Sequence, residues 1–150
     1  MRLIGRLRPC ARKLASVEAR IEPKKRGEGK TVLIVDDNPL VCKAIEGAFL
    51  SDGFEVCVAA ENGDLAIEAA KECRPDLIIL DLSMPLWNGL QAAPMLRRLF
   101  PKAPIFLYSL YADAVDKQTA TEAGLDLVIS KDEPPTSVVS KAHELMGGQR

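Results

Sequence analysis

Five polar residues stand directly after short apolar runs of this sequence, where core packing does not explain them. Asp36 and Asp37 follow VLIV, Asp81 follows LIIL, Ser109 follows PIFLY and Lys131 follows LVIS. Three carboxylates gathered in one place repel one another, and at least one must hold a proton unless a cation is present. A hard divalent cation resolves this conflict, and Mg²⁺ is suitable because it takes oxygen ligands and commonly bridges carboxylates to phosphate.

These residue types also suit a covalent reaction at phosphorus. A carboxylate that attacks phosphorus forms an acyl phosphate, and the remaining site must then neutralise the phosphoryl oxygens. Lysine supplies a point charge for this task and serine a neutral donor. We therefore predict metal-binding roles for Asp36 and Asp37, a combined ligand and nucleophile role for Asp81, and phosphoryl contacts from Ser109 and Lys131.

Simpler interpretations exist for the same residues, as turn residues, helix caps or a solvated lysine. The pair Asp36 and Asp37 stands before a predicted helix, yet Asn38 and Pro39 already supply the N-cap and the first helical position. Two acids that capping does not need favour a metal site. For Asp81, the convergence of four partners at one place favours chemistry over a turn.

From residue 31 onward, apolar runs alternate with segments of helical period, which is typical of βα units and a parallel sheet. The predicted strands are 32–35, 55–59, 76–80, 105–108 and 126–130. The predicted helices are 39–50, 63–73, 90–100, 113–123 and 135–146. Right-handed crossovers bring the carboxyl ends of parallel strands to one edge of a sheet, so the five polar residues are expected to meet there.

Length and composition limit the chain to one ordinary globular domain. It has 150 residues, of which 47% are hydrophobic and 27% are charged. No apolar run approaches the roughly 18 residues of a membrane span. The four cysteines form no CxxC pair, so we expect reduced core thiols in a cytoplasmic protein and no zinc site.

Four motifs of the chain resemble those of a known family. Residues 31–148 resemble the CheY-like receiver domain of two-component response regulators, through VLIVDDNP at 32–39, LIILDLSMPLWNGL at 77–90, PIFLYS at 104–109 and SK at 130–131. The resemblance implies an α/β fold with a five-stranded parallel sheet, helices on both faces and the flavodoxin-like strand order 2-1-3-4-5. It also implies a magnesium-dependent phosphoacceptor whose phosphorylation alters partner binding.

Residue roles follow from the same resemblance. Asp81 would be the phosphoacceptor, with Asp36 and Asp37 as acidic residues of the magnesium site. The backbone carbonyl of Ser83 would be a further magnesium ligand, and Ser109 and Lys131 would contact the phosphoryl group.

Two positions depart from the family pattern, and a third lies where the family varies. Val128 stands where receivers usually carry an aromatic residue that swings inward on phosphorylation. Leu110 stands where a small residue is common, and Tyr111 occupies a variable position that tunes the phosphoryl lifetime. We expect phosphorylation to be retained, while these positions leave its readout at the fourth and fifth βα units open.

The expected phosphodonor is a sensor histidine kinase or phosphotransfer protein, and the downstream partner is a protein of unknown identity. We expect no DNA-binding domain in this chain and no turnover of an external substrate; a second copy of the chain is a further candidate partner. The alternative is a receiver-like interaction module that works without phosphorylation. A flavodoxin-like cofactor binder is disfavoured, because the acidic DDNP loop would repel flavin phosphate.

The first 30 residues differ from the rest in charge. They contain ten Lys/Arg and three Asp/Glu, a net charge of +7, while residues 31–150 contain ten and eighteen, a net charge of −8. Apolar residues recur at intervals of four and three from Leu3 to Ile21. This basic extension is expected to be disordered, or partly helical and able to bind acidic lipid, nucleic acid or a partner.

Overall fold

The computed structural model describes residues 29–59, 63–82 and 88–147. The predictions for the basic extension therefore fall almost entirely outside the described residues, and so does the carbonyl of Ser83.

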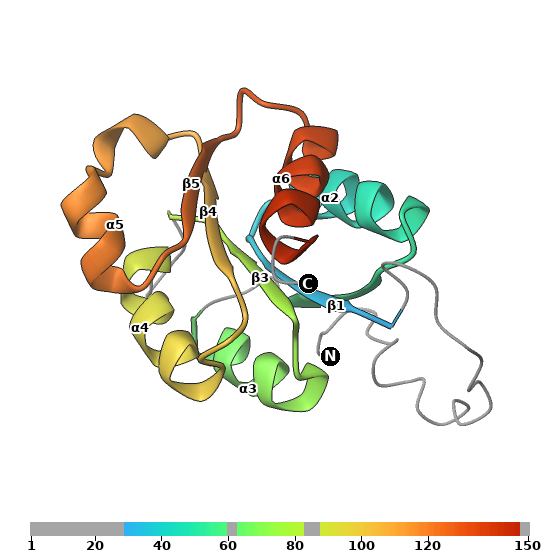
Figure 1. The fold of residues 1–150 in the computed structure, drawn as a ribbon, viewed down its shortest axis with the longest axis horizontal. Helices are drawn as coiled ribbons and strands as arrows, with labels where there is room; N and C mark the ends of the chain where they lie inside the picture. The colour runs from blue at the N-terminus through green and yellow to red at the C-terminus, as the bar shows by residue number, and fades with distance from the viewer. Residues whose placement is uncertain (1–28, 60–62, 83–87, 148–150) are drawn as a thin grey trace.

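A five-stranded parallel sheet forms the centre of the domain (Figure 1). Its strands are β1 (Thr31–Val35), β2 (Glu55–Ala59), β3 (Leu77–Leu80), β4 (Ile105–Ser109) and β5 (Leu127–Ser130). Their order across the sheet is β2-β1-β3-β4-β5, and every neighbouring pair is parallel. The fold class and the strand order are confirmed.

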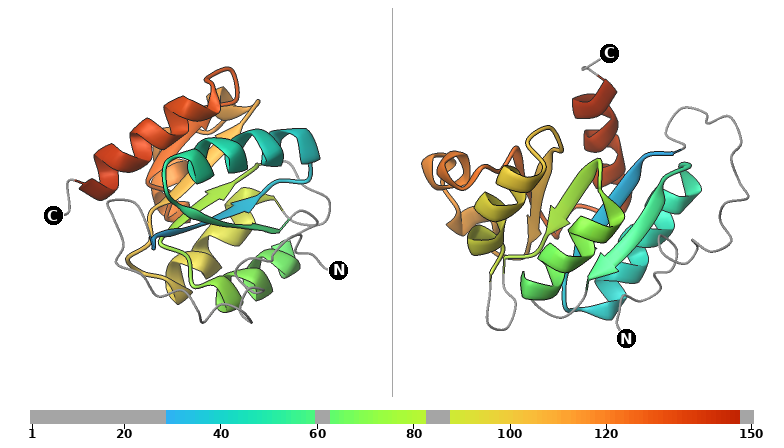
Figure 2. Two further views of the ribbon diagram at one scale, coloured as in Figure 1. Left: turned by 90° about the vertical axis from the view of Figure 1, so that its right-hand side faces the viewer. Right: turned by 90° about the horizontal axis from the view of Figure 1, so that it is seen from below.

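Helices cover both faces of this sheet, as Figure 2 shows from two further directions. They are α2 (Pro39–Ser51), α3 (Gly63–Cys73), α4 (Gly89–Leu99), α5 (Lys117–Ala123) and α6 (Pro135–Gly147). One face packs against α2 and α6, and the other packs against α3, α4 and α5. In the described ranges, no helix combines the length and apolar character that a bilayer crossing requires.

The inner strands are apolar on both sides because helices cover both sides. Every residue of β1, β3 and β4 is buried, which matches their nearly continuous apolar sequences. Alternate residues of each strand enter different cores, so Leu33 packs on the α3 side of the sheet while Ile34 packs on the α2 side. Burial on two faces fixes the register of the strands, and with it the positions of the residues that follow them.

Local signals set the helix ends close to the predicted positions. The side chain of Asn38 accepts a hydrogen bond from the backbone N–H of Leu40 at 2.9 Å, and Pro39 is the first residue of α2. Gly124 ends α5 with a φ of 88°, a left-handed conformation that glycine adopts without steric cost.

One helix prediction needs correction, and one helix has an internal proline. The helix predicted from residue 113 begins at Lys117, because a 3₁₀ turn occupies Ala112–Ala114 and Asp116 caps α5 by accepting the N–H of Thr119 at 2.7 Å. Pro94 lies inside α4 and beyond its first turn, so the helix lacks the hydrogen bond that residue 94 would donate to the carbonyl of residue 90.

The prediction of four reduced thiols is wrong for one pair of cysteines. Cys57 of β2 and Cys73 at the end of α3 form a disulfide, with Cα atoms 6.6 Å apart. Cys57 faces the α3 side of the sheet, so the helix that follows β2 returns its last residue to this position. Cys42 is a free, buried thiol, as predicted.

Candidate functional site

The acidic residues meet where β1 and β3 end. Asp81 donates its backbone N–H to the carbonyl of Val35 at 2.9 Å, which extends the pairing of these strands and sets Asp81 beside Asp36. Asp36 and Asp81 are only 2% and 6% exposed, whereas Asp37 is exposed to solvent. Oxygen atoms of the three carboxylates lie within 4.8 Å of one another. The predicted convergence of Asp36, Asp37 and Asp81 is therefore observed.

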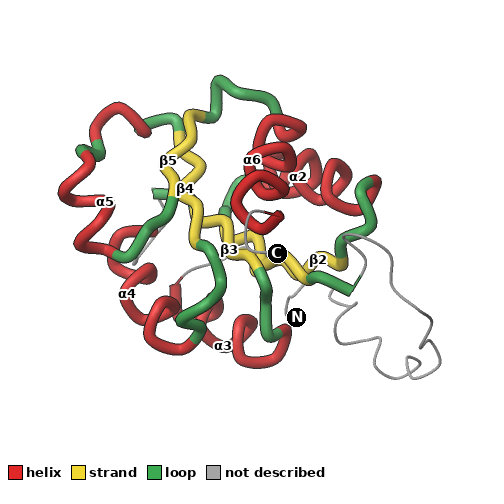
Figure 3. The backbone as a smooth tube through the Cα atoms, viewed as in Figure 1, coloured by secondary structure: helices red, strands yellow, loops and turns green. Residues whose placement is uncertain are grey.

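Lys131 reaches this acidic cluster from the loop between β5 and α6, which Figure 3 shows at the top of the view. Its ammonium nitrogen lies 2.6 Å from Oδ2 of Asp36 and 3.3 Å from Oδ1 of Asp81. Its backbone N–H donates to the carbonyl of Ser109 at 2.9 Å, which ties the ends of β4 and β5 together. Lys131 thus bridges the two buried carboxylates.

The charges in this cluster do not balance. Burial raises the pKa of Asp81, and the neighbouring carboxylate of Asp36 raises it further, while Lys131 opposes both. Burial alone would lower the pKa of Lys131, but its contacts with Asp36 and Asp81 outweigh this and raise it. One ammonium faces three carboxylates, so the cluster has an excess of negative charge.

The buried thiol of Cys42 lies next to the cluster, and the charge of Asp36 affects its pKa. Cys42 of α2 donates its Sγ–H to the carbonyl of Asp36 at 3.1 Å. Burial, followed by the charge of Asp36, raises the pKa of this thiol to about 12. Cys42 is therefore a neutral packing residue rather than a nucleophile or a metal ligand.

The donor set fits a hard divalent cation. Asp36, Asp37 and Asp81 offer only carboxylate oxygens, which suit Mg²⁺ and are poor ligands for soft metals. The exposed position of Asp37 leaves one side of the cluster open to water, and Mg²⁺ usually keeps several bound waters.

The predicted phosphoryl-binding and tuning residues lie around the same edge. Ser109 is fully buried, and its Oγ accepts the backbone N–H of Tyr111 at 2.9 Å. Leu110 and Tyr111 are 68% and 57% exposed, so both present side chains to solvent just beyond β4. Val128 is half-buried and packs with the core on the α4 and α5 side.

Gly89 lets the first turn of α4 lie directly against the phosphoacceptor candidate. A Cβ atom at this position would stand 2.5 Å from the carbonyl oxygen of Asp81 and 2.8 Å from a methyl carbon of Leu107. Real Cβ atoms do not approach backbone this closely, so only glycine fits without displacement of α4 or of Asp81.

A tyrosine beside the site was not predicted from the sequence. Tyr108 lies in β4 with 4% of its surface exposed, and its hydroxyl donates to the backbone carbonyl of Glu133 at 2.7 Å. A signal was available, because a tyrosine in a fully buried strand must find a partner for its hydroxyl. The identity of that partner depends on the loop after β5 and could not be derived from spacing.

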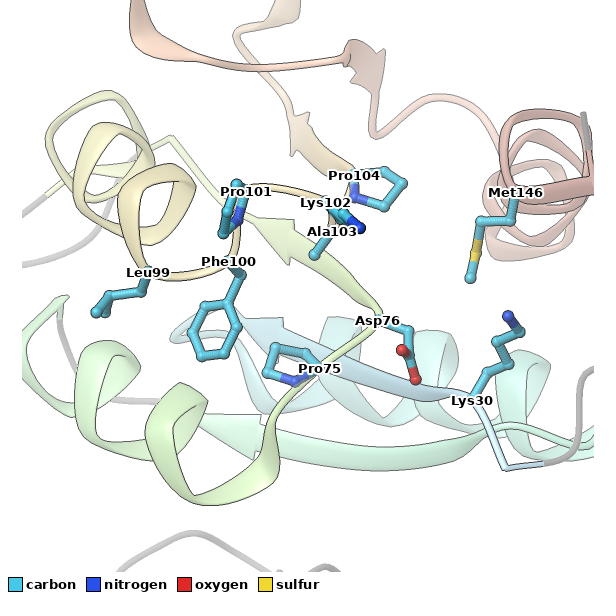
Figure 4. Close-up of a pocket in the computed structure, with 10 residues that line it drawn as sticks. All are labelled: Lys30, Pro75, Asp76, Leu99, Phe100, Pro101, Lys102, Ala103, Pro104 and Met146. Atoms are coloured by element: carbon cyan, nitrogen blue, oxygen red, sulfur yellow. The ribbon is translucent and has the colours of Figure 1, made fainter. Parts of the chain in front are cut away.

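The groove drawn in Figure 4 is a separate feature. It has a volume of about 390 Å³ and is lined by residues that precede strands, among them Lys30, Asp76 and Pro104. These positions belong to the amino-end edge of the parallel sheet, opposite the acidic cluster. The groove therefore takes no part in the site.

Fold and site together define a class of protein: a flavodoxin-like α/β domain with a cluster of three carboxylates that could hold a cation, and a lysine, at the carboxyl edge of its sheet. Comparison with known families then identifies the member of this class. Residues 32–143 match the response regulator receiver domain. The chain belongs to this family.

Curated relatives agree with this assignment. The chain is 32% identical over 123 residues to the nitrate/nitrite response regulator protein NarL of Escherichia coli, with coverage of 81% of this chain and 57% of NarL. It is 32% identical over 117 residues to the chemotaxis protein CheY of Thermotoga maritima, with coverage of 78% of this chain and 98% of that protein. The chain thus spans little more than half the length of NarL and nearly all of CheY.

Solved structures agree as well. The response regulator protein TrrA of Thermotoga maritima, in complex with magnesium and beryllofluoride, is similar at 28% identity with a TM-score of 0.69, over 77% of this chain and 98% of that one. A CheY-like receiver domain protein from Methanospirillum hungatei has a TM-score of 0.74 at 23% identity, over 80% of this chain and 95% of that one, which supports the fold.

Proposed function

We propose that this protein is a phosphoacceptor receiver of a two-component phosphorelay and that Asp81 takes the phosphoryl group. The observation that carries this proposal is the pairing of a buried carboxylate with a lysine, 3.3 Å away, inside a cluster of three carboxylates. Such a site combines a nucleophile, a charge that neutralises phosphoryl oxygens and the ligands for a divalent cation.

The reaction is transfer from a phosphohistidine of a sensor kinase or phosphotransfer protein. An oxygen of the Asp81 carboxylate attacks phosphorus, an O–P bond forms and the P–N bond to the donor imidazole breaks. The released imidazole keeps the bonding electron pair and takes up a proton from water. The product is an acyl phosphate at Asp81, and its hydrolysis returns the free carboxylate.

Residues of this chain prepare the site for that step. Asp36, Asp37 and Asp81 would hold Mg²⁺, with the carbonyl of Ser83 as a further ligand. When bound, the cation neutralises charge on the phosphoryl oxygens and on the carboxylates. Lys131 stands ready to pair with a phosphoryl oxygen, since its ammonium already lies between Asp36 and Asp81.

Ser109 would donate its hydroxyl to another phosphoryl oxygen from the adjacent strand end. In the present structure Ser109 Oγ accepts from the backbone N–H of Tyr111, which leaves the hydroxyl hydrogen free to turn toward such a ligand. The exposed side chains of Leu110 and Tyr111 would limit the access of water, and so tune the lifetime of the acyl phosphate.

We further propose that the phosphorylated form acts in the cytoplasm by binding a downstream protein differently, and that the chain turns over no external substrate. The sequence similarity to CheY and NarL supports a signalling role. The similarity to TrrA supports the magnesium requirement, because that protein holds magnesium and beryllofluoride.

A second candidate is an interaction module that works without phosphorylation. The observation in its favour is Val128, a small side chain packed with the core at the position where an aromatic switch residue is expected. This candidate predicts equal affinity for a partner in the presence and absence of a phosphodonor.

Amide NMR spectra test the main proposal. Addition of beryllofluoride and Mg²⁺ to the wild-type protein should shift the amides around Asp81, Ser109 and Lys131, and Asp81→Asn should abolish these shifts. Unchanged wild-type spectra, or equal shifts in the variant, would exclude Asp81 as the phosphoacceptor.

A further inference from the structure

The buried tyrosine of β4 is bonded to the turn that follows β5, next to the site. Tyr108 precedes Ser109 at the end of β4, while its hydroxyl bonds to the carbonyl of Glu133 in the turn after β5. Burial raises the pKa of Tyr108, so the hydroxyl keeps its proton at neutral pH and remains a hydrogen-bond donor. The bond has the usual O–H···O length, 2.7 Å, and only 4% of the residue surface is exposed to water.

Glu133 is the anchor of that turn. Its backbone N–H donates to the carbonyl of Ser130 at 3.0 Å, and its carboxylate accepts from the hydroxyl of Ser137 at 2.6 Å. The ammonium of Lys141 lies 3.7 Å from the same carboxylate. The contacts from Ser130, Ser137 and Lys141 come from β5 and α6, and Tyr108 supplies the connection to β4.

The same turn carries the site lysine. Lys131 lies between Ser130 and Glu133, and its ammonium must reach Asp36 and Asp81 from this position. Its backbone N–H bonds to Ser109, so the turn has two connections to the end of β4, one at Lys131 and one at Glu133. Two hydrogen bonds fix the orientation of the turn relative to β4, whereas a turn held by a single bond could rotate about that bond.

We propose that Tyr108 is a positioning residue: through the carbonyl of Glu133, its hydroxyl orients the turn that places the ammonium of Lys131 between Asp36 and Asp81. The side-chain hydrogen bond of Tyr108 goes to the backbone of Glu133 and not to a carboxylate of the cluster, so its effect on phosphorylation is expected to pass through Lys131. This inference rests on the proposed function of the site. A buried hydroxyl that merely needs a partner would give stability without any effect on Lys131.

The test compares Tyr108→Phe with the wild type, since this substitution removes the hydroxyl and keeps the ring. The initial rate of Asp81 phosphorylation by acetyl phosphate with saturating Mg²⁺ is followed by intact-mass spectrometry. We expect the rate to fall about tenfold, which corresponds to a loss of about 1.4 kcal/mol of transition-state stabilisation from a misplaced Lys131 ammonium. Ile45→Val is the matched control, because Ile45 is buried in the same core as Tyr108 but lies in α2. Its unfolding midpoint should fall while its rate stays within twofold of the wild type.

A double-mutant cycle separates positioning from stability. The Lys131→Met background lacks the ammonium. In it, the ratio of the phosphorylation rates with tyrosine and with phenylalanine at residue 108 should shrink from about tenfold to less than twofold. An undiminished tenfold factor in this background would overturn the inference, as would a single-variant rate within twofold of the wild type. A wild-type protein that takes up no phosphoryl group would overturn the proposed function itself. A wild-type protein that is phosphorylated normally, with an equal rate in Tyr108→Phe, would overturn only the role of Tyr108.

Discussion

Removal of the Asp81 charge should stabilise the metal-free protein. Oxygen atoms of the three carboxylates lie within 4.8 Å of one another, so each pair is disfavoured by about 3.5 kcal/mol at an effective dielectric constant of about 20. The ion pair with Lys131 at 3.3 Å is favourable by about 5 kcal/mol on the same scale. Repulsion from Asp36 therefore offsets most of this attraction, and the burial of Asp81, together with the screened charge of the exposed Asp37, acts in the same direction as that repulsion.

Asp81→Asn keeps the shape of the side chain and removes its charge. Because Asp37 is exposed, solvent screens part of its repulsion, and we expect a gain of about 1–2 kcal/mol in the free energy of unfolding. The measurement is urea denaturation with EDTA at neutral pH. The control is Asp126→Asn at the opposite edge of the sheet, where the carboxylate pairs with Arg97 and accepts the N–H of Ile105 at 2.8 Å. This control should lose stability.

Magnesium should remove the advantage of the variant. At a concentration 100 times its dissociation constant, Mg²⁺ stabilises the wild type by about 2.7 kcal/mol, and a variant with tenfold lower affinity by about 1.4 kcal/mol. Wild-type and variant stabilities should then nearly coincide. A loss of stability for Asp81→Asn in EDTA, or an equal gain from Mg²⁺ in both proteins, would refute the claim that excess negative charge in the cluster destabilises the metal-free protein.

The dependence on pH follows from the raised pKa of Asp81. A carboxyl group whose pKa is raised by folding costs no stability below its unfolded pKa, and costs most above its folded pKa. The advantage of Asp81→Asn in EDTA should therefore be greatest above the raised pKa of Asp81 and shrink as the pH falls through it.

Three further predictions concern the surroundings of the site. Gly89→Ala should lower stability by about 1–3 kcal/mol and slow phosphorylation, because the new methyl group meets the carbonyl of Asp81; urea denaturation and acetyl phosphate kinetics measure the two effects. Asn38→Ala should cost about 1 kcal/mol through loss of the α2 cap, as measured by urea denaturation, and a stability equal to the wild type would argue against the cap. Peptide mapping without reductant should recover Cys57 and Cys73 as a linked pair, and two separately alkylated thiols would contradict the disulfide.

Much of the fold follows from patterns that are local in sequence. Alternation of apolar runs with helical segments predicted all five strands, since each inner strand is covered on both faces and must be apolar throughout. Asn38 and Gly124 marked helix ends because the backbone needs a cap acceptor at one and a positive φ at the other. The acidic cluster was predictable for the same reason, because parallel strands end at one edge.

Contacts between distant segments were not predictable in this way. The disulfide between Cys57 and Cys73 depends on how far α3 carries the chain back along the sheet. The bond from Tyr108 to Glu133 depends on the conformation of the loop after β5, which has no periodic pattern. Spacing shows which residues follow which strands, but it does not show which loop atoms a buried hydroxyl will meet.

Chemical trapping of the modified residue tests the central claim most directly. Borohydride reduces an aspartyl phosphate to homoserine, and peptide mass spectrometry then locates the converted position. After incubation with acetyl phosphate and Mg²⁺, homoserine should replace aspartate at residue 81 alone, and should be missing when EDTA is present. Conversion at another aspartate, or none at residue 81 under conditions that label a CheY control, would contradict the assignment of Asp81 as the phosphoacceptor.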